Sequence, residues 1–251
     1  MSQAGGASAE ARSPRSPSHA AVGCQDLVAG YGRLPVLRGV TIAVNPGEVV
    51  ALLGANGAGK STTILSLAGE IAATSGQVFF NGAPASGALH DRARRGLRLI
   101  TEDRAVLMSL SVADNLRLAH RSLEEPLTLF PELRPLLKRR VGLLSGGEQQ
   151  MLTLARALAG NSKVLLADEL SLGLGPLVVK RLLHAVRKAA DRGMAVLLVE
   201  QQMRNALSVA DYLYVMRRGR VALHGDRHEL AARIAEVRAA YLTEVEPEGP
   251  A

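Results

Sequence analysis

Short apolar runs, separated by polar stretches rich in glycine, dominate the hydrophobic pattern of this chain. The runs typical of β-strands cover residues 22–28, 40–44, 49–53, 77–80, 97–101, 164–167, 195–199, 212–216 and 220–224. Helical periodicity marks residues 60–68, 147–159, 177–190 and 226–241, and also 103–142 with breaks expected at Pro126, Pro131 and Pro135. Continuous apolar strands alternating with helices predict βαβ units and a mostly parallel sheet covered on both faces.

Length and composition fit one large domain with an aliphatic core. The chain has 251 residues, of which 47% are hydrophobic, whereas only 3% are aromatic and Trp is absent. The net charge of +7 would suit nucleic acid, anionic lipid or an acidic partner. Its Lys and Arg residues occur as scattered pairs and triplets without interleaved aromatics, which favours a solvated basic face.

The ends of the chain and its single cysteine bear on location. Cys24 cannot form an internal disulfide, which indicates a reducing compartment. Residues 1–20 lack the apolar segment of a secretory signal and are expected to be a disordered tail, and residues 244–251 a frayed one. The longest apolar runs fall far short of the roughly 20 residues that span a membrane. Any work at a membrane is therefore expected from its cytoplasmic side.

A phosphate-binding loop is the first sign of chemistry. Residues 54–61 read G-A-N-G-A-G-K-S, between the strand 49–53 and the helix 60–68. Glycines in such a loop let backbone N–H groups turn toward phosphate oxygens, and the helix dipole favours the anion. Lys60 would place a positive charge on the β- and γ-phosphates, and Ser61 would offer a hydroxyl to Mg²⁺. The predicted phosphate-binding residues are Gly54, Asn56, Gly57, Ala58, Gly59, Lys60, Ser61 and Thr62.

Two carboxylates follow the apolar run 164–167. Asp168 stands at the carboxyl end of this predicted strand, where open α/β sheets collect their ligands, and is expected to be a direct or indirect partner of Mg²⁺. Glu169 is expected to be the general base that polarises the water attacking the γ-phosphate. The alternative is a charged pair that merely ends a strand.

A second glycine-containing motif, L-S-G-G-E-Q-Q over residues 144–150, precedes these carboxylates. Ser145 has the short hydroxyl of a helix N-cap, and Gly146 and Gly147 leave backbone amides accessible at the start of a helix. Glu148 follows in the first turn of the same helix. The helix dipole there would favour an anion, although the motif also makes sense as a simple cap.

The phosphate loop, L-S-G-G-E-Q-Q and the apolar run ending in Asp-Glu together resemble the ATP-binding subunits of ABC transporters, over residues 22–242. The resemblance implies a P-loop NTPase core of α/β class, with a mostly parallel sheet, an N-terminal antiparallel β subdomain and a small helical subdomain. The nucleotide-binding domain would cover residues 21–243, with the helical subdomain at about 103–156. It also implies ATP and Mg²⁺ as ligands, and a dimer in which the helix cap at Ser145 faces the γ-phosphate held by the opposite protomer.

Further residues take roles only through this resemblance. Tyr31, in G-Y-G, stands where the family stacks an aromatic on adenine. Glu102 stands where most members have a nucleotide- and metal-linked Gln, and Gln201 where most have a switch His, so Gln201 joins Glu169 as a catalytic candidate that contacts the γ-phosphate. V-E-Q over residues 199–201 resembles the ATPases of branched-chain amino acid importers, whose urea and amide relatives share it. Leu170 departs from the family, which has Pro there.

The function implied is that of an ATP-hydrolysing motor of an importer, peripheral on the cytoplasmic face of the plasma membrane. Its partners would be transmembrane permease subunits, a second ATPase subunit that is identical or paralogous and, indirectly, an extracytoplasmic substrate-binding protein, without nucleic acid. A soluble ABC-type ATPase acting on nucleic acid or the ribosome is the alternative that the positive charge supports. A catalytically silent regulatory subunit is a third, since the switch His is missing.

Overall fold

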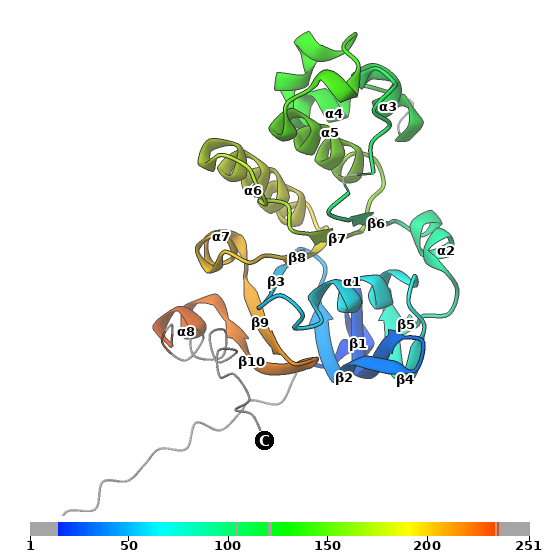
Figure 1. The fold of residues 1–251 in the computed structure, drawn as a ribbon, viewed down its shortest axis with the longest axis vertical. Helices are drawn as coiled ribbons and strands as arrows, with labels where there is room; N and C mark the ends of the chain where they lie inside the picture. Colours follow the sequence, from blue (N-terminus) through cyan, green and yellow to red (C-terminus); the bar gives the residue numbers. More distant parts are fainter. Residues whose placement is uncertain (1–14, 104, 120–121, 234, 236–251) are drawn as a thin grey trace, which may run out of the picture.

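A six-stranded, mostly parallel sheet forms the centre of the molecule (Figure 1). The computed structural model describes residues 15–103, 105–119, 122–233 and 235. The strands of this sheet are β3 (Val49–Gly54), β6 (Leu97–Ile100), β7 (Val164–Asp168), β8 (Ala195–Val199), β9 (Tyr212–Arg217) and β10 (Arg220–Asp226). They lie in the order β10-β9-β3-β8-β7-β6, and only β9 and β10 pair antiparallel. The carboxyl ends of β3, β7 and β8 therefore meet at one edge.

A smaller antiparallel sheet lies beside the first. Its strands are β1 (Val22–Tyr31), β2 (Leu34–Val44), β4 (Ala73–Phe80) and β5 (Ala83–Pro84). Their order is β2-β1-β4-β5, and every neighbouring pair is antiparallel. The expected antiparallel subdomain is therefore present, and its first two strands extend further than the apolar runs indicated.

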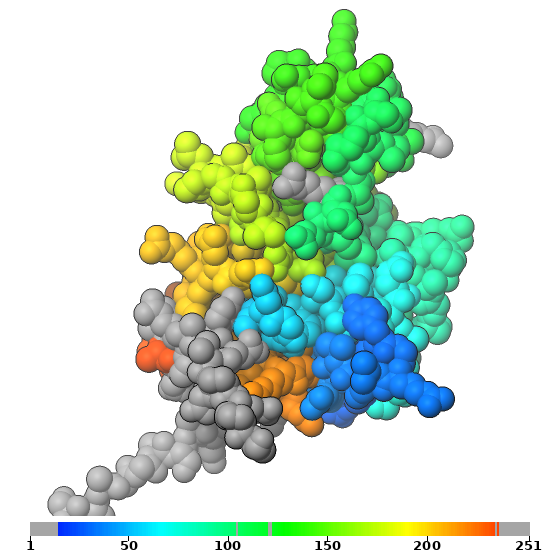
Figure 2. Space-filling view, in the orientation of Figure 1, coloured from blue at the N-terminus to red at the C-terminus, as the bar shows by residue number. Residues whose placement is uncertain are grey.

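Helices cover the central sheet and build a separate lobe. They are α1 (Lys60–Ala68), α2 (Leu89–Arg94), α3 (Val112–Ala119), α4 (Glu124–Leu129), α5 (Gly146–Leu158), α6 (Pro176–Asp191), α7 (Met203–Val209) and α8 (Arg227–Ala232). Helix α1 packs between the two sheets, whereas α6 and α7 pack against β3 from the other side. Helices α3, α4 and α5 form the lobe at the top of Figures 1 and 2. The predicted α/β class with a small helical subdomain is confirmed.

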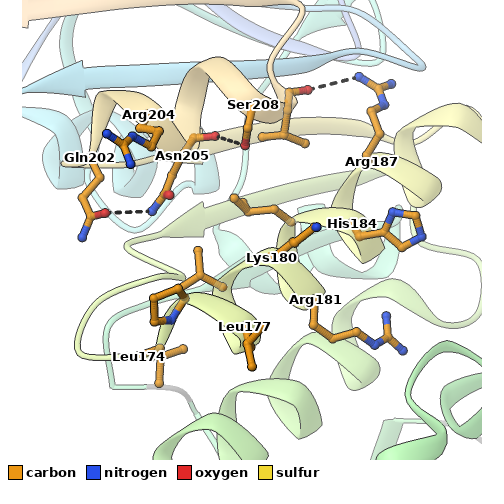
Figure 3. A pocket seen from close by; sticks show the side chains of 14 residues that line it. Leu174, Leu177, Lys180, Arg181, His184, Arg187, Gln202, Arg204, Asn205 and Ser208 are labelled. Carbon is orange, nitrogen blue, oxygen red and sulfur yellow. Dashed lines mark hydrogen bonds between the residues drawn. The ribbon is translucent and has the colours of Figure 1, made fainter.

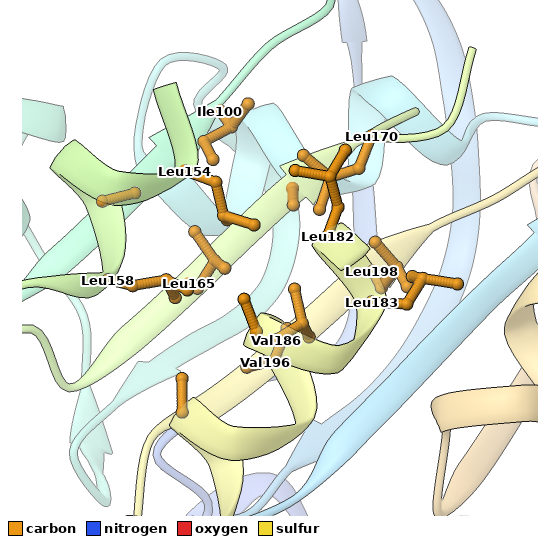
Figure 4. Close-up of a cluster of buried hydrophobic side chains, with 14 of the residues drawn as sticks. Ile100, Leu154, Leu158, Leu165, Leu170, Leu182, Leu183, Val186, Val196 and Leu198 are labelled. Carbon is orange, nitrogen blue, oxygen red and sulfur yellow. The ribbon is translucent and has the colours of Figure 1, made fainter. Parts of the chain in front are cut away.

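Because successive side chains of the central strands point to opposite faces of the sheet, they pack into two separate cores. On β3, Val49, Ala51 and Leu53 join a core with α5 and α6, while Val50 and Leu52 join one with α1 and the antiparallel sheet. Figure 4 shows the first core, which Leu170 enters from the loop after β7. Leu170 is 1% exposed, so the residue that replaces the family's Pro fills this core.

Several sequence predictions need correction at their limits. The tail expected over residues 1–20 is too long, because Pro17–His19 form a 3₁₀ helix and Pro17 is buried against β1 at Gly23. Pro126 does not break a helix, since it lies in the first turn of α4, where its missing N–H has no helical acceptor. Residues 1–14 and 244–251, and the end of the helix predicted over 226–241, lie outside the described residues. Within the described part of the chain, no helix is long and apolar enough to cross a membrane.

Candidate active site

The phosphate loop connects β3 to α1, as the sequence predicts, and its backbone needs glycine. Gly54 has φ 156°, and a Cβ there would lie 2.6 Å from the carbonyl oxygen of Met216 on β9. Gly57 has φ 80° at a place where a Cβ would meet only open space. The first glycine thus allows close packing on the sheet, and the second allows a left-handed turn on the open side of the loop.

Lys60 opens α1 and folds back over the loop. Its Nζ donates hydrogen bonds to the carbonyl oxygens of Gly54 and Ala55, both at 2.9 Å, and the residue is only 5% exposed. The ammonium is therefore held at the loop itself, where it balances the inward carbonyls. A phosphate chain seated on the loop would meet this charge directly.

Asp168 ends β7 beside the phosphate loop. Burial raises the pKa of its carboxyl, as do the negative charges of Glu169 and Glu102, whereas a hydrogen bond with Ser61 and the charge of Lys60 oppose the shift. A cavity of about 210 Å³ lies in front of the carboxyl. Its lining residues are Thr101, Glu102, Gln150, Asp168, Glu169 and Leu172. The structure thus brings Ser61, Glu102, Asp168 and Glu169 together.

The donor set of this site fits a hard divalent cation. The Oδ1 atom of Asp168 is buried and has no hydrogen-bond partner among the described residues, and the carboxyl is hydrogen-bonded to the Ser61 side chain. Oxygen ligands of this kind suit Mg²⁺. The described part of the chain holds no group of three or more His, Cys, Asp or Glu side chains placed for a metal.

Glu169 lies in a strained turn, and both its backbone N–H and its side-chain carboxylate make hydrogen bonds. Its φ is 51°, which costs a non-glycine residue about 1–2 kcal/mol. Its N–H donates to the carbonyl oxygen of Val199 at 3.1 Å, and its carboxylate accepts a hydrogen bond from the Nε2 of Gln201. The candidate base is thus fixed by β8 and by the residue that stands at the switch position. We expected Gln201 to contact a phosphate, and that contact stays a prediction beside the observed one.

Ser145 caps α5 in the expected way. Its Oγ accepts from the N–H of Glu148 at 3.3 Å, while the Glu148 carboxylate accepts from the N–H of Ser145 at 2.7 Å. This reciprocal pair is a capping box, so Glu148 orders the helix start, and its role at a nucleotide stays a prediction. A Cβ on Gly147 would lie 3.2 Å from Val178, which places this glycine against α6. In Figure 1, α5 lies in the upper lobe, away from α1.

Tyr31 ends β1 at the turn to β2. The ring is 57% exposed, and the turn is tight because a Cβ on Gly30 would lie 2.0 Å from the carbonyl oxygen of Leu34. An exposed ring on a rigid hairpin offers a flat apolar surface, which is what stacking on a base requires. The adenine role stays a prediction.

Two residues of this region were missed from the sequence. Gln150 lines the cavity in front of Asp168, and the only signal for it was its place at the end of the L-S-G-G-E-Q-Q motif. Glu200 lies between Val199 and Gln201 and is 1% exposed. A carboxylate directly after a fully apolar strand was the available signal for Glu200.

A larger cavity lies elsewhere in the described part of the chain. It measures about 890 Å³ and lies between α6 and α7, with Leu177, Lys180, Gln202 and Asn205 in its lining (Figure 3). None of the predicted site residues lines it. The predicted residues Glu102, Asp168 and Glu169 line the smaller cavity instead.

Comparisons with known proteins agree with this geometry. Residues 37–171 match the family described as ABC transporter. The chain is 37% identical over 222 residues to the high-affinity branched-chain amino acid transport ATP-binding protein BraG of Pseudomonas aeruginosa, covering 84% of this chain and 95% of that protein. It is 36% identical over 215 residues to the probable branched-chain amino acid transport ATP-binding protein LivF of Archaeoglobus fulgidus, covering 81% and 91%. Among solved structures, an ATP-binding cassette of an ABC transporter in its ADP conformation is similar with a TM-score of 0.79 and 25% identity, covering 89% and 98%.

Proposed function

The chain belongs to the ATP-binding subunits of ABC transporters and is an ATPase, and from this premise we propose that it drives an importer of branched-chain amino acids. The observation that carries the catalytic part is the meeting of Lys60, Asp168 and Glu169 at one edge of the central sheet. The substrate part rests on the names of BraG and LivF, each matched over more than nine-tenths of its length.

Hydrolysis would use the site as follows. The amides of the phosphate loop and Lys60 hold the β- and γ-phosphates. Ser61 and Asp168 would hold Mg²⁺, which would supply positive charge against the phosphate oxygens. Glu169 accepts a proton from water as the water oxygen bonds to the γ-phosphorus. The bond from that phosphorus to the β–γ bridging oxygen breaks, so that ADP and phosphate leave. Gln201 donates a hydrogen bond to the Glu169 carboxylate and thereby keeps the base oriented toward the water.

A second ATPase subunit would complete each site. Ser145 at the start of α5 is exposed, and the positive end of the helix dipole there would suit an anion held by another chain. Two chains facing each other would place the cap of one against the phosphate loop of the other. Closure on ATP and reopening after hydrolysis would then be the motion that drives transport.

An apolar patch on the helical lobe suits a membrane permease. Leu107, Met108 and Leu143 are exposed, and the N–H of Gly142 donates to the carbonyl oxygen of Met108 at 2.9 Å, which joins the two segments. Exposed apolar side chains that gather in this way mark interaction surfaces. Docking there would hold the subunit on the cytoplasmic face of the membrane. The transport names of the relatives favour this partner over nucleic acid or the ribosome.

The test is reconstitution with a branched-chain amino acid permease and its binding protein. In proteoliposomes, leucine-loaded binding protein should stimulate both ATP hydrolysis and leucine uptake, and Glu169→Gln should abolish both. Leu143→Asp should release the chain from the permease, whereas Leu177→Asp, at a more exposed leucine on α6, should not (exposures 65% and 84%). Stimulation by urea or an amide instead of leucine would overturn the substrate, and ATP hydrolysis indifferent to the permease would overturn the importer.

A further inference from the structure

Glu200 is a buried carboxyl that the hydrolysis scheme leaves without a role. It follows β8 directly, and its N–H donates to the carbonyl oxygen of Leu52 on β3 at 3.3 Å. It is 1% exposed, and its Oε1 has no hydrogen-bond partner among the described residues. Burial raises the pKa of this carboxyl, Ser171 and Asn205 oppose the shift, and the charge of Glu169 adds to it. An acid in this place is costly, and an apolar side chain of similar size would serve stability better.

A short hydrogen bond links Glu200 to the turn that carries the candidate base. The Ser171 hydroxyl donates to Glu200 Oε2 at 2.6 Å, and both residues are buried. Ser171 stands two residues after Glu169, within a turn closed by the hydrogen bond from the N–H of Leu172 to the carbonyl oxygen of Glu169 at 3.2 Å. A left-handed φ at Glu169 persists only where its surroundings impose it, and this contact is part of those surroundings.

Glu200 and Gln201, which follow β8, thus both make hydrogen bonds to the turn after β7. Gln201 holds the Glu169 carboxylate, and Glu200 holds Ser171. We propose that Glu200 is a positioning residue, which acts through Ser171 to keep the Glu169 turn in the geometry for hydrolysis. This inference rests on the proposed ATPase site and adds a residue to it.

The same carboxyl ties the turn to α7. Asn205, on α7, lies near enough to Glu200 to favour its charged form, and the Nδ2 of Asn205 donates to Gln202 Oε1 at 3.4 Å (Figure 3). The turn after β7, the segment after β8 and the first turn of α7 therefore form one polar cluster. A movement of α7 would therefore change the position of Glu169, because Glu200 and Ser171 connect the two.

The experiment compares four variants of the full chain in steady-state ATP hydrolysis, ATP binding and thermal unfolding. Glu200→Leu should leave ATP affinity within about twofold and not lower Tm, yet reduce kcat by about 10- to 100-fold, the loss that misplacement of a reacting group by about 1 Å causes. Glu200→Gln keeps an acceptor for Ser171 and should restore most of the rate. Ser171→Ala should lower kcat as Glu200→Leu does. The double variant that combines Ser171→Ala with Glu200→Leu should have a kcat no lower than that of the slower of the two single variants.

Ser66→Ala is the matched control, because Ser66 is also a buried serine, and its Oγ has no partner among the described residues. It should keep the wild-type kcat. A wild-type kcat in Glu200→Leu, or a loss that follows the fraction unfolded, would overturn the inference. A Glu200→Gln variant with a low kcat would also overturn the inference. So would a double variant in which the losses of kcat from Glu200→Leu and Ser171→Ala add independently.

Hydrogen exchange separates this inference from the proposed function. In Glu200→Leu the amides of Leu172 and Leu174, whose acceptors are Glu169 and Ser171, should exchange faster while those of α1 stay protected. If the wild-type chain hydrolysed no ATP, the proposed function would fail, and the exchange result would still decide whether Glu200 holds the turn. Unchanged exchange at both amides would overturn the positioning role.

Discussion

Replacing Gln201 by alanine tests how the Glu169 carboxylate is oriented. The Nε2 of Gln201 donates to Glu169 Oε1, so the alanine variant removes this donor and leaves the backbone of the turn in place. The left-handed φ of Glu169 and its N–H bond to Val199 do not depend on the Gln201 side chain. The carboxylate should therefore remain at the site but rotate more freely.

The size of the effect follows from the kind of bond. A hydrogen bond to a charged group contributes about 1.5–3 kcal/mol, and the half-buried position of both partners argues for the lower value. About 1.5 kcal/mol of lost orientation corresponds to a roughly tenfold lower kcat. Glu169→Gln removes the base itself and should cost about 10²–10⁴-fold. ATP affinity should change little in Gln201→Ala, because the phosphates bind to the loop.

Steady-state ATP hydrolysis by the single and double variants decides the matter. Gln201→Ala in a Glu169→Gln background should cost almost nothing further, since no base is left to orient. Gln201→His keeps an N–H donor and should retain most of the rate. A fully active Gln201→Ala enzyme would refute the reasoning, and an equal loss from Gln201→Ala with and without Glu169 would point to a phosphate contact instead.

Three further predictions concern other parts of the molecule. Lys60→Ala should weaken ATP binding by more than about tenfold in calorimetry, because the ammonium over the loop is lost, whereas Lys180→Ala, at an exposed lysine on α6, should bind like the wild type. Leu170→Ala should lower the free energy of unfolding in urea by about 2–5 kcal/mol, and Leu172→Ala, at an exposed leucine, by under about 1 kcal/mol; equal losses would contradict the core role of Leu170. Burial raises the pKa of the Glu200 carboxyl, so this group stays protonated to higher pH in the folded state than in the unfolded state. The free energy of unfolding of the wild type, relative to that of Glu200→Gln, should therefore fall as pH rises above the ordinary range of a carboxyl. Urea melts in which this difference in free energy stays constant with pH would contradict the prediction.

The phosphate loop and the strands of the central sheet could be predicted because their signals are local. Residues 54–61 carry the loop chemistry in eight consecutive positions, and the fully buried strands around them read as uninterrupted apolar runs. The strands of residues 212–216 and 220–224 were predicted for the same reason, and Arg218 and Gly219 between them both take positive φ in the turn. In these places the residue types leave few alternative backbones.

What the sequence did not reveal depends on contacts between distant segments. Ser171 and Glu200 are 29 positions apart, and nothing local tells that their side chains meet. Pro17 was assigned to a tail because residues 1–20 lack an apolar segment, yet it packs against Gly23, where the lack of a side chain leaves room. Helices α2 and α7 have six and seven residues, too few to show a period.

The way Glu169 is held suggests why this chain can work without a switch His. A His at the switch position could contact a phosphate and also carry a proton, whereas the amide of Gln201 only donates a hydrogen bond near neutral pH. Here that bond goes to Glu169, while Glu200 fixes the backbone two residues further on. Orientation of the base is thus divided between a side-chain contact and a buried contact to the turn. On this argument the acidic residue before Gln201 matters as much as Gln201 itself, because a donor alone cannot orient a carboxylate whose backbone is free to move.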